Sequence, residues 1–180
     1  AELAADPSLV GVKNGVVNLR DGSFQPHHRD ALVTRRLATK FDPTATCPTF
    51  ERFLAEVQPD AENRAFLQRL TGCYITGEVR EHILPFHFGT GANGKGTFLE
   101  YVVLKLLGTY GVKLTDALAY SHARGHIPHL EIAKLCGKRV ALGEESNDVG
   151  RRCAGFCKTI SAEAHQNGRC SNGNCVEFSP

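Results

Sequence analysis

The chain has 180 residues, of which 42% are apolar, and its formal net charge is only +2. This length suits one domain of ordinary size, or a small N-terminal module on a larger one, and the apolar fraction allows a real core. Because the net charge is small, contact with nucleic acid would need a local basic patch, which argues against a protein that coats DNA through a general electrostatic field.

No apolar run is long enough to span a bilayer, and residues 1–7 lack the basic and apolar regions of a signal peptide. We therefore expect an intracellular protein with no membrane contact. The chain contains no Met, even at position 1, which suggests a piece of a longer chain. Its seven cysteines, an odd number, fit reduced thiols better than a disulfide scaffold.

The N-terminal residues favour strands. Apolar stretches over 10–13 and 16–19 flank Asn14-Gly15, and Asp21-Gly22 follows closely. This pattern predicts a small β-meander with tight primed turns.

Two helices are predicted next. Apolar residues recur at helical spacing over 50–57, and a second apolar stripe runs over 61–70. We interpret the aromatic residues of these helices, Phe50, Phe53 and Phe66, as core packing.

From residue 83 onward, apolar strand-like stretches alternate with helical ones. This order predicts a parallel α/β sheet with a ligand at the carboxyl ends of its strands. The predicted elements are a buried strand over 83–88, a helix over 97–107 ended by Gly108, a strand over 110–114, a helix over 130–136 ended by Gly137, and a strand over 139–143.

A glycine-rich loop joins the first of these strands to its helix. Gly89, Gly91 and Gly94 keep the loop compact, and Lys95 supplies a cation at the Walker A spacing. Such loops bind triphosphates through backbone N–H groups, a helix N-terminus and the lysine. A glycine-rich turn without a ligand is the alternative. The predicted nucleotide-binding residues are Gly89, Thr90, Gly91, Ala92, Asn93, Gly94, Lys95, Gly96 and Thr97.

The loop departs from the Walker A pattern at one position. The residue after the lysine is normally Ser or Thr, whose hydroxyl binds Mg²⁺, but here it is Gly96, with Thr97 one step later. The sequence therefore supports nucleotide binding better than efficient hydrolysis.

We expect Thr97 and Glu144 as metal ligands. Glu144 and Glu145 follow the last predicted strand, where acids hold Mg²⁺ and activate water, although a solvated strand end is the simpler alternative.

Several stretches in one order carry a resemblance: residues 15–22, 41–43, 47–50 and 89–99. From about residue 11 to 180 the chain resembles the helicase part of phage and plasmid primase-helicases, the superfamily 3 group that includes the poxvirus primase-helicase. The resemblance implies an AAA+-like P-loop NTPase of the α/β class. It also implies an N-terminal β and helical segment over 1–80 and an ATPase core over 81–180 that stops before the family's sensor residue.

The same resemblance assigns roles to residues. It makes Lys95 catalytic, Glu144 and Glu145 the Walker B acids, and Lys158 and Arg169 part of a hairpin that faces DNA. The family's Gly-Gly-Asp in that hairpin is replaced by residues 162–164. Taken alone, each of the two basic residues is better explained as an ordinary surface charge than as a DNA contact.

The function implied is an ATP-dependent DNA helicase that uses ATP and Mg²⁺. Its expected partners are single-stranded or forked DNA, five further copies of itself in a homo-hexamer, and a primase domain, fused or separate. An ATP-binding remnant or interaction module with little turnover is one alternative. A P-loop phosphotransferase acting on a small molecule is another, but it would not explain the β-rich N-terminal segment.

Four late cysteines, with His165 among them, could form a zinc site, but their spacing favours reduced, partly buried thiols. They are Cys153, Cys157, Cys170 and Cys175.

Overall fold

The structure is a computed structural model that describes residues 6–77, 83–114, 132–143, 166–169 and 175–178. The chain divides into two compact units. The first comprises Ala1–Gly77 and His87–Thr109, and the second comprises Glu78–Phe86 and Tyr110–Pro180. The glycine-rich loop lies entirely in the first unit.

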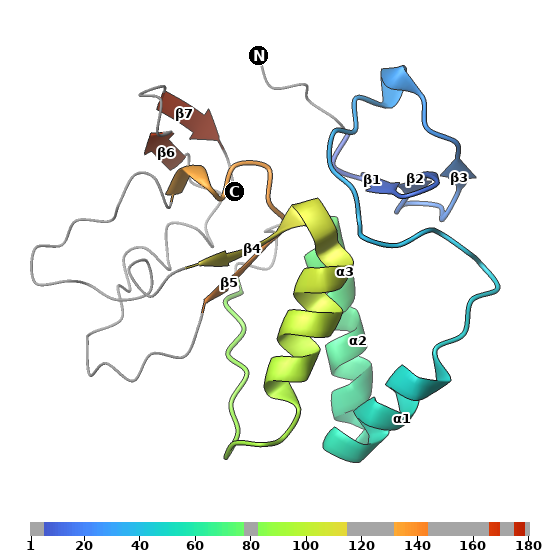
Figure 1. The fold of residues 1–180 in the computed structure, drawn as a ribbon, viewed down its shortest axis with the longest axis vertical. Helices are drawn as coiled ribbons and strands as arrows, with labels where there is room; N and C mark the ends of the chain where they lie inside the picture. The colour runs from blue at the N-terminus through green and yellow to red at the C-terminus, as the bar shows by residue number, and fades with distance from the viewer. Residues whose placement is uncertain (1–5, 78–82, 115–131, 144–165, 170–174, 179–180) are drawn as a thin grey trace, which may run out of the picture. The chain divides into compact units, whose positions relative to one another are not determined.

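The first unit begins with a three-stranded antiparallel sheet, which confirms the predicted meander (Figure 1). Its strands are β1 (Leu9–Val12), β2 (Gly15–Asn18) and β3 (Phe24–Gln25). Four valines of β1 and β2 are buried and supply the core of this part. They are Val10, Val12, Val16 and Val17.

The predicted primed turn at Asn14-Gly15 is wrong. Val12 pairs with Gly15, so Lys13 and Asn14 form the turn, and neither has the positive φ that a primed turn requires. Gly15 instead serves the packing of the sheet. A Cβ on Gly15 would lie 2.6 Å from Cε2 of Phe24 and would also collide with the carbonyl oxygen of Gln25, both on β3.

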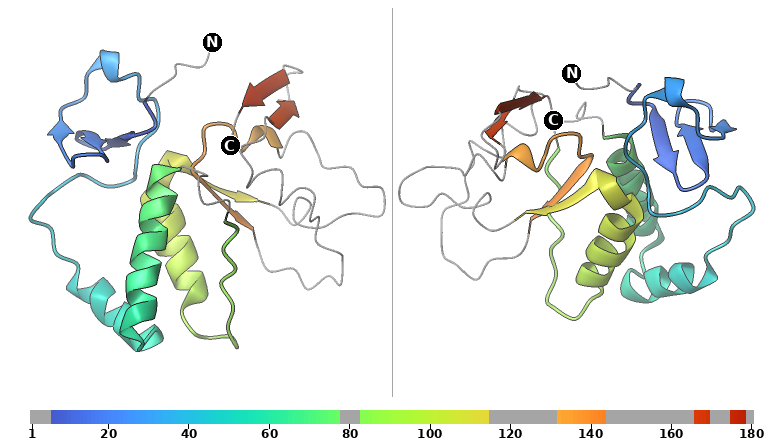
Figure 2. Two further views of the ribbon diagram at one scale, coloured as in Figure 1. Left: turned by 180° about the vertical axis from the view of Figure 1, so that it is seen from behind. Right: turned by 45° about the horizontal axis from the view of Figure 1, so that its top comes forward.

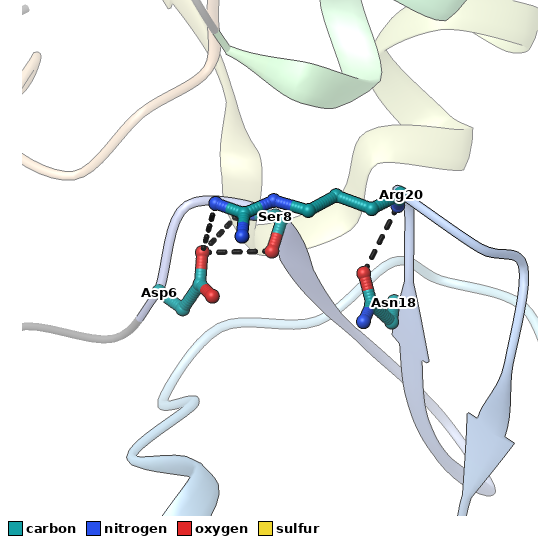
Figure 3. A network of polar contacts seen from close by, with 4 residues as sticks. All are labelled: Asp6, Ser8, Asn18 and Arg20. Carbon is teal, nitrogen blue, oxygen red and sulfur yellow. Dashed lines mark hydrogen bonds and ion pairs between the residues drawn. The ribbon is translucent and has the colours of Figure 1, made fainter.

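Polar contacts join the start of β1 to the end of β2 (Figure 3). Asp6 Oδ1 accepts hydrogen bonds from the Ser8 amide at 2.9 Å and the Ser8 hydroxyl at 2.7 Å, and it lies 3.5 Å from the Arg20 guanidinium. The Arg20 amide donates in turn to Asn18 Oδ1 at 2.9 Å. The Ser8 hydrogen bonds, with a smaller contribution from the Arg20 charge, lower the pKa of Asp6.

Two helices follow, as predicted: α1 (Pro48–Val57) and α2 (Ala61–Thr76). Pro48 occupies the first turn of α1, where a missing N–H costs no hydrogen bond. Asp60 caps α2 by accepting hydrogen bonds from the amides of the residues two and three positions later. The left-handed Gly77 ends α2, which continues beyond the predicted end at residue 70.

The predicted helix over 97–107 is confirmed, but most of it is wound as a π-helix. It consists of η2 (Thr97–Leu104), the π-helical part, and α3 (Lys105–Leu107), followed by the 3-10 turn η3 (Gly108–Tyr110). Gly108 has φ 55° and ends the helix as expected. This helix lies beside α2 in all three views (Figures 1 and 2).

Backbone hydrogen bonds fasten the end of this helix to the segment after the first sheet. The Ala38 amide donates to the Leu106 carbonyl at 2.9 Å, and the Thr109 amide donates to the Arg36 carbonyl at 3.1 Å. Val103 and Leu107, each 1% exposed, anchor the helix in the core.

The second unit contains the predicted parallel strand pair, β4 (Gly111–Leu114) and β5 (Val140–Gly143). Before β5, residues 132–133 are helical and residues 134–137 form turns. Gly137 has φ 65°. The start of the predicted helix over 130–136 lies outside the described residues. A short hairpin of β6 (Gln166–Arg169) and β7 (Cys175–Phe178) follows. The fold is mixed α/β with a small parallel sheet.

The predicted buried strand over 83–88 is wrong. These residues form neither helix nor strand, and Phe86 and Phe88 are 64% and 94% exposed. An apolar run becomes a strand only where a partner strand accepts its hydrogen bonds, and Pro85 lacks an amide hydrogen for such a ladder. Within the described residues, no helix is long and apolar enough to cross a membrane.

Candidate functional site

The glycine-rich loop follows a tightly curled backbone path. Gly91, Ala92 and Gly94 have φ angles of 95°, 47° and 79°, all in the left-handed region. Glycine adopts this region without a steric penalty, whereas Ala92 does so under strain. Successive amides in left-handed turns can form concave sites for anions, which is a feature that a phosphate-binding loop needs.

The Lys95 side chain folds back over the loop from the first turn of the helix. Its Nζ donates hydrogen bonds to the Gly89 carbonyl oxygen and to Asn93 Oδ1, both at 3.1 Å. The side chain is half-buried. Lys95 Nζ therefore joins the start of the loop to a residue near its end. Lys95 is also the residue that the sequence predicts to bind phosphate.

A cluster of rings holds the start of the loop. His87 Nε2 lies 3.3 Å from the Tyr74 hydroxyl on α2, and the His87 ring lies 6.2 Å from the Phe98 ring, centroid to centroid. Burial lowers the pKa of His87 and raises the pKa of Tyr74 to about 12. Both groups are therefore uncharged at neutral pH, which suits a packed junction between α2 and the loop. No pattern in the sequence predicts this contact, since the two residues lie in different predicted elements.

Helix α1 holds the end of the loop. A Cβ on Gly94 would lie 2.7 Å from Val57 Cγ1 and 3.2 Å from Phe53 Cζ, so the loop backbone packs directly against this helix. The Gly94 carbonyl accepts a hydrogen bond from the Phe98 amide at 2.9 Å, which begins the helical winding. The loop is thus fixed by α1 at one end and by α2 at the other.

A hollow of about 600 Å³ lies between the beginning of α1 and η2. We call it the α1–η2 hollow. Its wall is mostly apolar and carries hydroxyl groups at several points. The lining residues are Thr46, Cys47, Pro48, Thr49, Phe50, Phe53, Thr97 and Val102.

The prediction that the aromatic residues of the two helices are core residues is wrong. No residue of α1 is fully buried: Phe50 and Phe53 are partly exposed and line the α1–η2 hollow. Phe66 on α2 is 54% exposed, whereas Leu70 on the same helix is buried. Helical spacing identified the apolar face correctly, but it could not show that part of this face borders an open hollow.

The two residues after the lysine differ in their surroundings. Gly96 has helical backbone angles, φ −58° and ψ −43°, and apart from its chain neighbours and the backbone of its own helix no atom lies within 4 Å of a Cβ built on it. A serine would therefore fit at this position. Thr97, the predicted metal ligand of the loop, is exposed and lies on the wall of the α1–η2 hollow. Gly96 offers no hydroxyl, so the donor set at this turn is poorer than in a complete Walker A loop.

The remaining predicted site residues belong to the second unit. Glu144, Glu145 and Lys158 lie outside the described residues, as do Cys153, Cys157 and Cys170 of the cysteine cluster. Arg169 ends β6 and Cys175 begins β7. Among the residues whose side chains are described, no group of three His, Cys, Asp or Glu could hold a metal ion.

Comparison with known proteins supplies independent information. A family model described as "D5 N terminal like" matches residues 1–59. A protein of Acanthamoeba polyphaga mimivirus named as a putative helicase is 27% identical over 91% of this chain. Proteins named in the same way from Invertebrate iridescent virus 3 and from Frog virus 3 are 24% and 32% identical over 75% and 61% of the chain. These matches support the predicted resemblance of the chain to the phage and viral primase-helicase family.

These relatives are much longer than this chain. The aligned regions span 19%, 15% and 11% of the mimivirus, iridescent virus and frog virus proteins. The matches therefore concern one part of each relative.

Proposed function

We propose that this chain is the ATP-binding part of a DNA helicase that acts in replication. One observation carries the proposal: Lys95 folds over a left-handed glycine loop at the start of a helix, with its Nζ 3.1 Å from both Gly89 O and Asn93 Oδ1. A loop of small residues, a helix N-terminus and one cation are the features that bind a triphosphate.

The geometry suggests how the loop would exchange partners on binding. The two oxygens that accept from Lys95 Nζ are a neutral carbonyl and a neutral amide. Phosphate oxygens carry a negative charge and form stronger, charge-assisted hydrogen bonds with an ammonium group. A nucleotide would therefore replace these acceptors without any need to move the loop backbone, which α1 and the ring cluster around His87 already hold.

The other parts of the machinery come from the primase-helicase resemblance. Glu144 and Glu145, with Thr97, would hold Mg²⁺, and one of the acids would orient the attacking water. Lys158 and Arg169 would contact single-stranded or forked DNA. A homo-hexamer would place ATP between neighbouring copies, and a primase domain would act in the same protein or beside it.

DNA-stimulated ATP hydrolysis tests this proposal. The rate of phosphate release should rise on addition of single-stranded DNA and should fall to background in Lys95→Ala. Lys105→Ala is the matched control, because Lys105 is an exposed lysine on the same helix whose Nζ lies 4.0 Å from the ring centre of Tyr101. Turnover that is indifferent to DNA, or equal loss in both variants, would contradict the helicase proposal.

A binding module with little turnover is the second candidate, and Gly96 is the observation that favours it. Without the hydroxyl that normally binds Mg²⁺, nucleotide affinity should depend only weakly on the metal. The open space around Gly96 allows a direct test with Gly96→Ser. In ATP titrations with and without Mg²⁺, this variant should gain metal dependence and turnover. If the unaltered chain already requires Mg²⁺ to bind ATP, this second candidate fails.

A further inference from the structure

We propose that the α1–η2 hollow receives the base of the nucleotide whose phosphates bind to the glycine-rich loop. The inference rests on the proposed nucleotide binding and adds a second subsite to it. The loop and the hollow belong to the same compact unit, so their relation is given by contacts within that unit.

The hollow borders the end of the loop at Thr97. Phe53, which lines the hollow, lies 3.2 Å from the position of a Cβ on Gly94, and Thr97, on the opposite wall, lies in the first turn of the helix that follows Lys95. A nucleotide with its phosphates at the helix start can therefore reach the hollow with its base.

The π-helical winding of η2 shapes the wall of the hollow. In a π-helix the amide of one residue bonds to the carbonyl five positions earlier, as the Lys105 amide does with Glu100. Residues five apart therefore lie one above the other, which places Thr97 and Val102 on one side of the helix, where both line the hollow. Regular α-helical winding would turn Val102 away from Thr97. Such π-helical segments are frequent at functional sites.

The chemistry of the lining suits a planar heteroaromatic ring. Phe50 and Phe53 present two rings with centroids 6.4 Å apart and planes 33° apart, both partly exposed. Thr46, Thr49 and Thr97 are the residues of the wall that carry a hydroxyl group. An apolar surface for the faces of a ring, with a few polar groups for its edge, is the usual composition of a small-molecule site, and about 600 Å³ lies within the usual range of volumes.

Paired titrations of the full chain with ATP and with inorganic tripolyphosphate separate the two subsites. Phe50→Ala should weaken ATP binding about tenfold, from the loss of base–aromatic stacking, and leave tripolyphosphate binding unchanged. Phe66→Ala, an exposed phenylalanine on α2, is the matched control and should change neither. If Phe50→Ala weakens the binding of ATP and of tripolyphosphate equally, or weakens the binding of neither, the proposed base site is wrong. Binding of tripolyphosphate to the unaltered chain would still support the phosphate loop in that case. If the unaltered chain binds neither ligand, both proposals fail.

Thiol modification gives a second test that needs no substitution. Cys47 lines the hollow, and Cys73 on α2 is an exposed thiol outside it. Iodoacetamide labelling, followed peptide by peptide, should slow at Cys47 when ATP is present and stay unchanged with tripolyphosphate. Labelling of Cys73 should be the same in all cases. Unchanged labelling of Cys47 in saturating ATP would overturn the proposal.

Discussion

Replacement of Gly94 by alanine tests how the phosphate loop is held. Gly94 has φ 79°, and a Cβ at this position would lie 2.7 Å from Val57 Cγ1 on α1. The substitution therefore has two separate costs. An L-residue in the left-handed region loses about 1–2 kcal/mol, and an extra methyl group forced into a packed contact costs about 1–3 kcal/mol.

Together these costs predict that Gly94→Ala lowers the free energy of unfolding by about 2–5 kcal/mol. Gly96 provides the matched control two residues later. It has helical backbone angles and open space at its Cβ position, so Gly96→Ala should raise the free energy of unfolding by about 0.5–1 kcal/mol, the gain of alanine over glycine in a helix.

Urea unfolding followed by far-ultraviolet circular dichroism measures both effects, since the chain has no Trp for fluorescence. The two substitutions must change the stability in opposite directions. Equal changes, or a loss below about 0.5 kcal/mol in Gly94→Ala, would refute the close packing of the loop against α1.

Three further predictions concern the surroundings of the loop. Ala92→Gly should raise the free energy of unfolding by about 1 kcal/mol in urea, because it relieves a left-handed alanine with φ 47°; a loss of stability would contradict this strain. Asp60→Ala should lower that free energy by about 1 kcal/mol, because it removes the acceptor 2.8 Å from the Glu62 amide, and Asp60→Asn should restore most of the loss if capping is the cause. Because burial lowers the pKa of His87 below its ordinary 6.5, the unfolded chain takes up the proton first, and stability should fall as pH drops through 6.5. Urea unfolding at about pH 7.5 and pH 5.5 should show a smaller difference for His87→Gln than for the unaltered chain, and an equal difference would rule out a role for this ring.

The sequence predicted the elements whose signals are local. Helical spacing located α1 and α2, the order of glycines and Lys95 located the loop, and Gly108 and Gly137 marked the ends of helical stretches. Each of these signals is a property of a few neighbouring residues. Such patterns can be recognised without knowledge of what lies across the fold.

The errors and omissions concern contacts between distant residues. An apolar run over 83–88 contains no information on whether a partner strand is available, so its strand was predicted in error. The contact of Tyr74 with His87 and the packing of Gly94 against Val57 join different elements, and no spacing rule anticipates them. The π-helical winding of η2 was likewise not anticipated, since the sequence of apolar residues fits an ordinary helix.

Titration of the chain with ATP tests the central claim most directly. If Lys95 binds the phosphates, Lys95→Ala should weaken ATP binding about 10- to 100-fold, the loss of hydrogen bonds to a charged group, while Lys105→Ala binds as tightly as the unaltered chain. Equal affinity of Lys95→Ala and the unaltered chain for ATP would contradict the account.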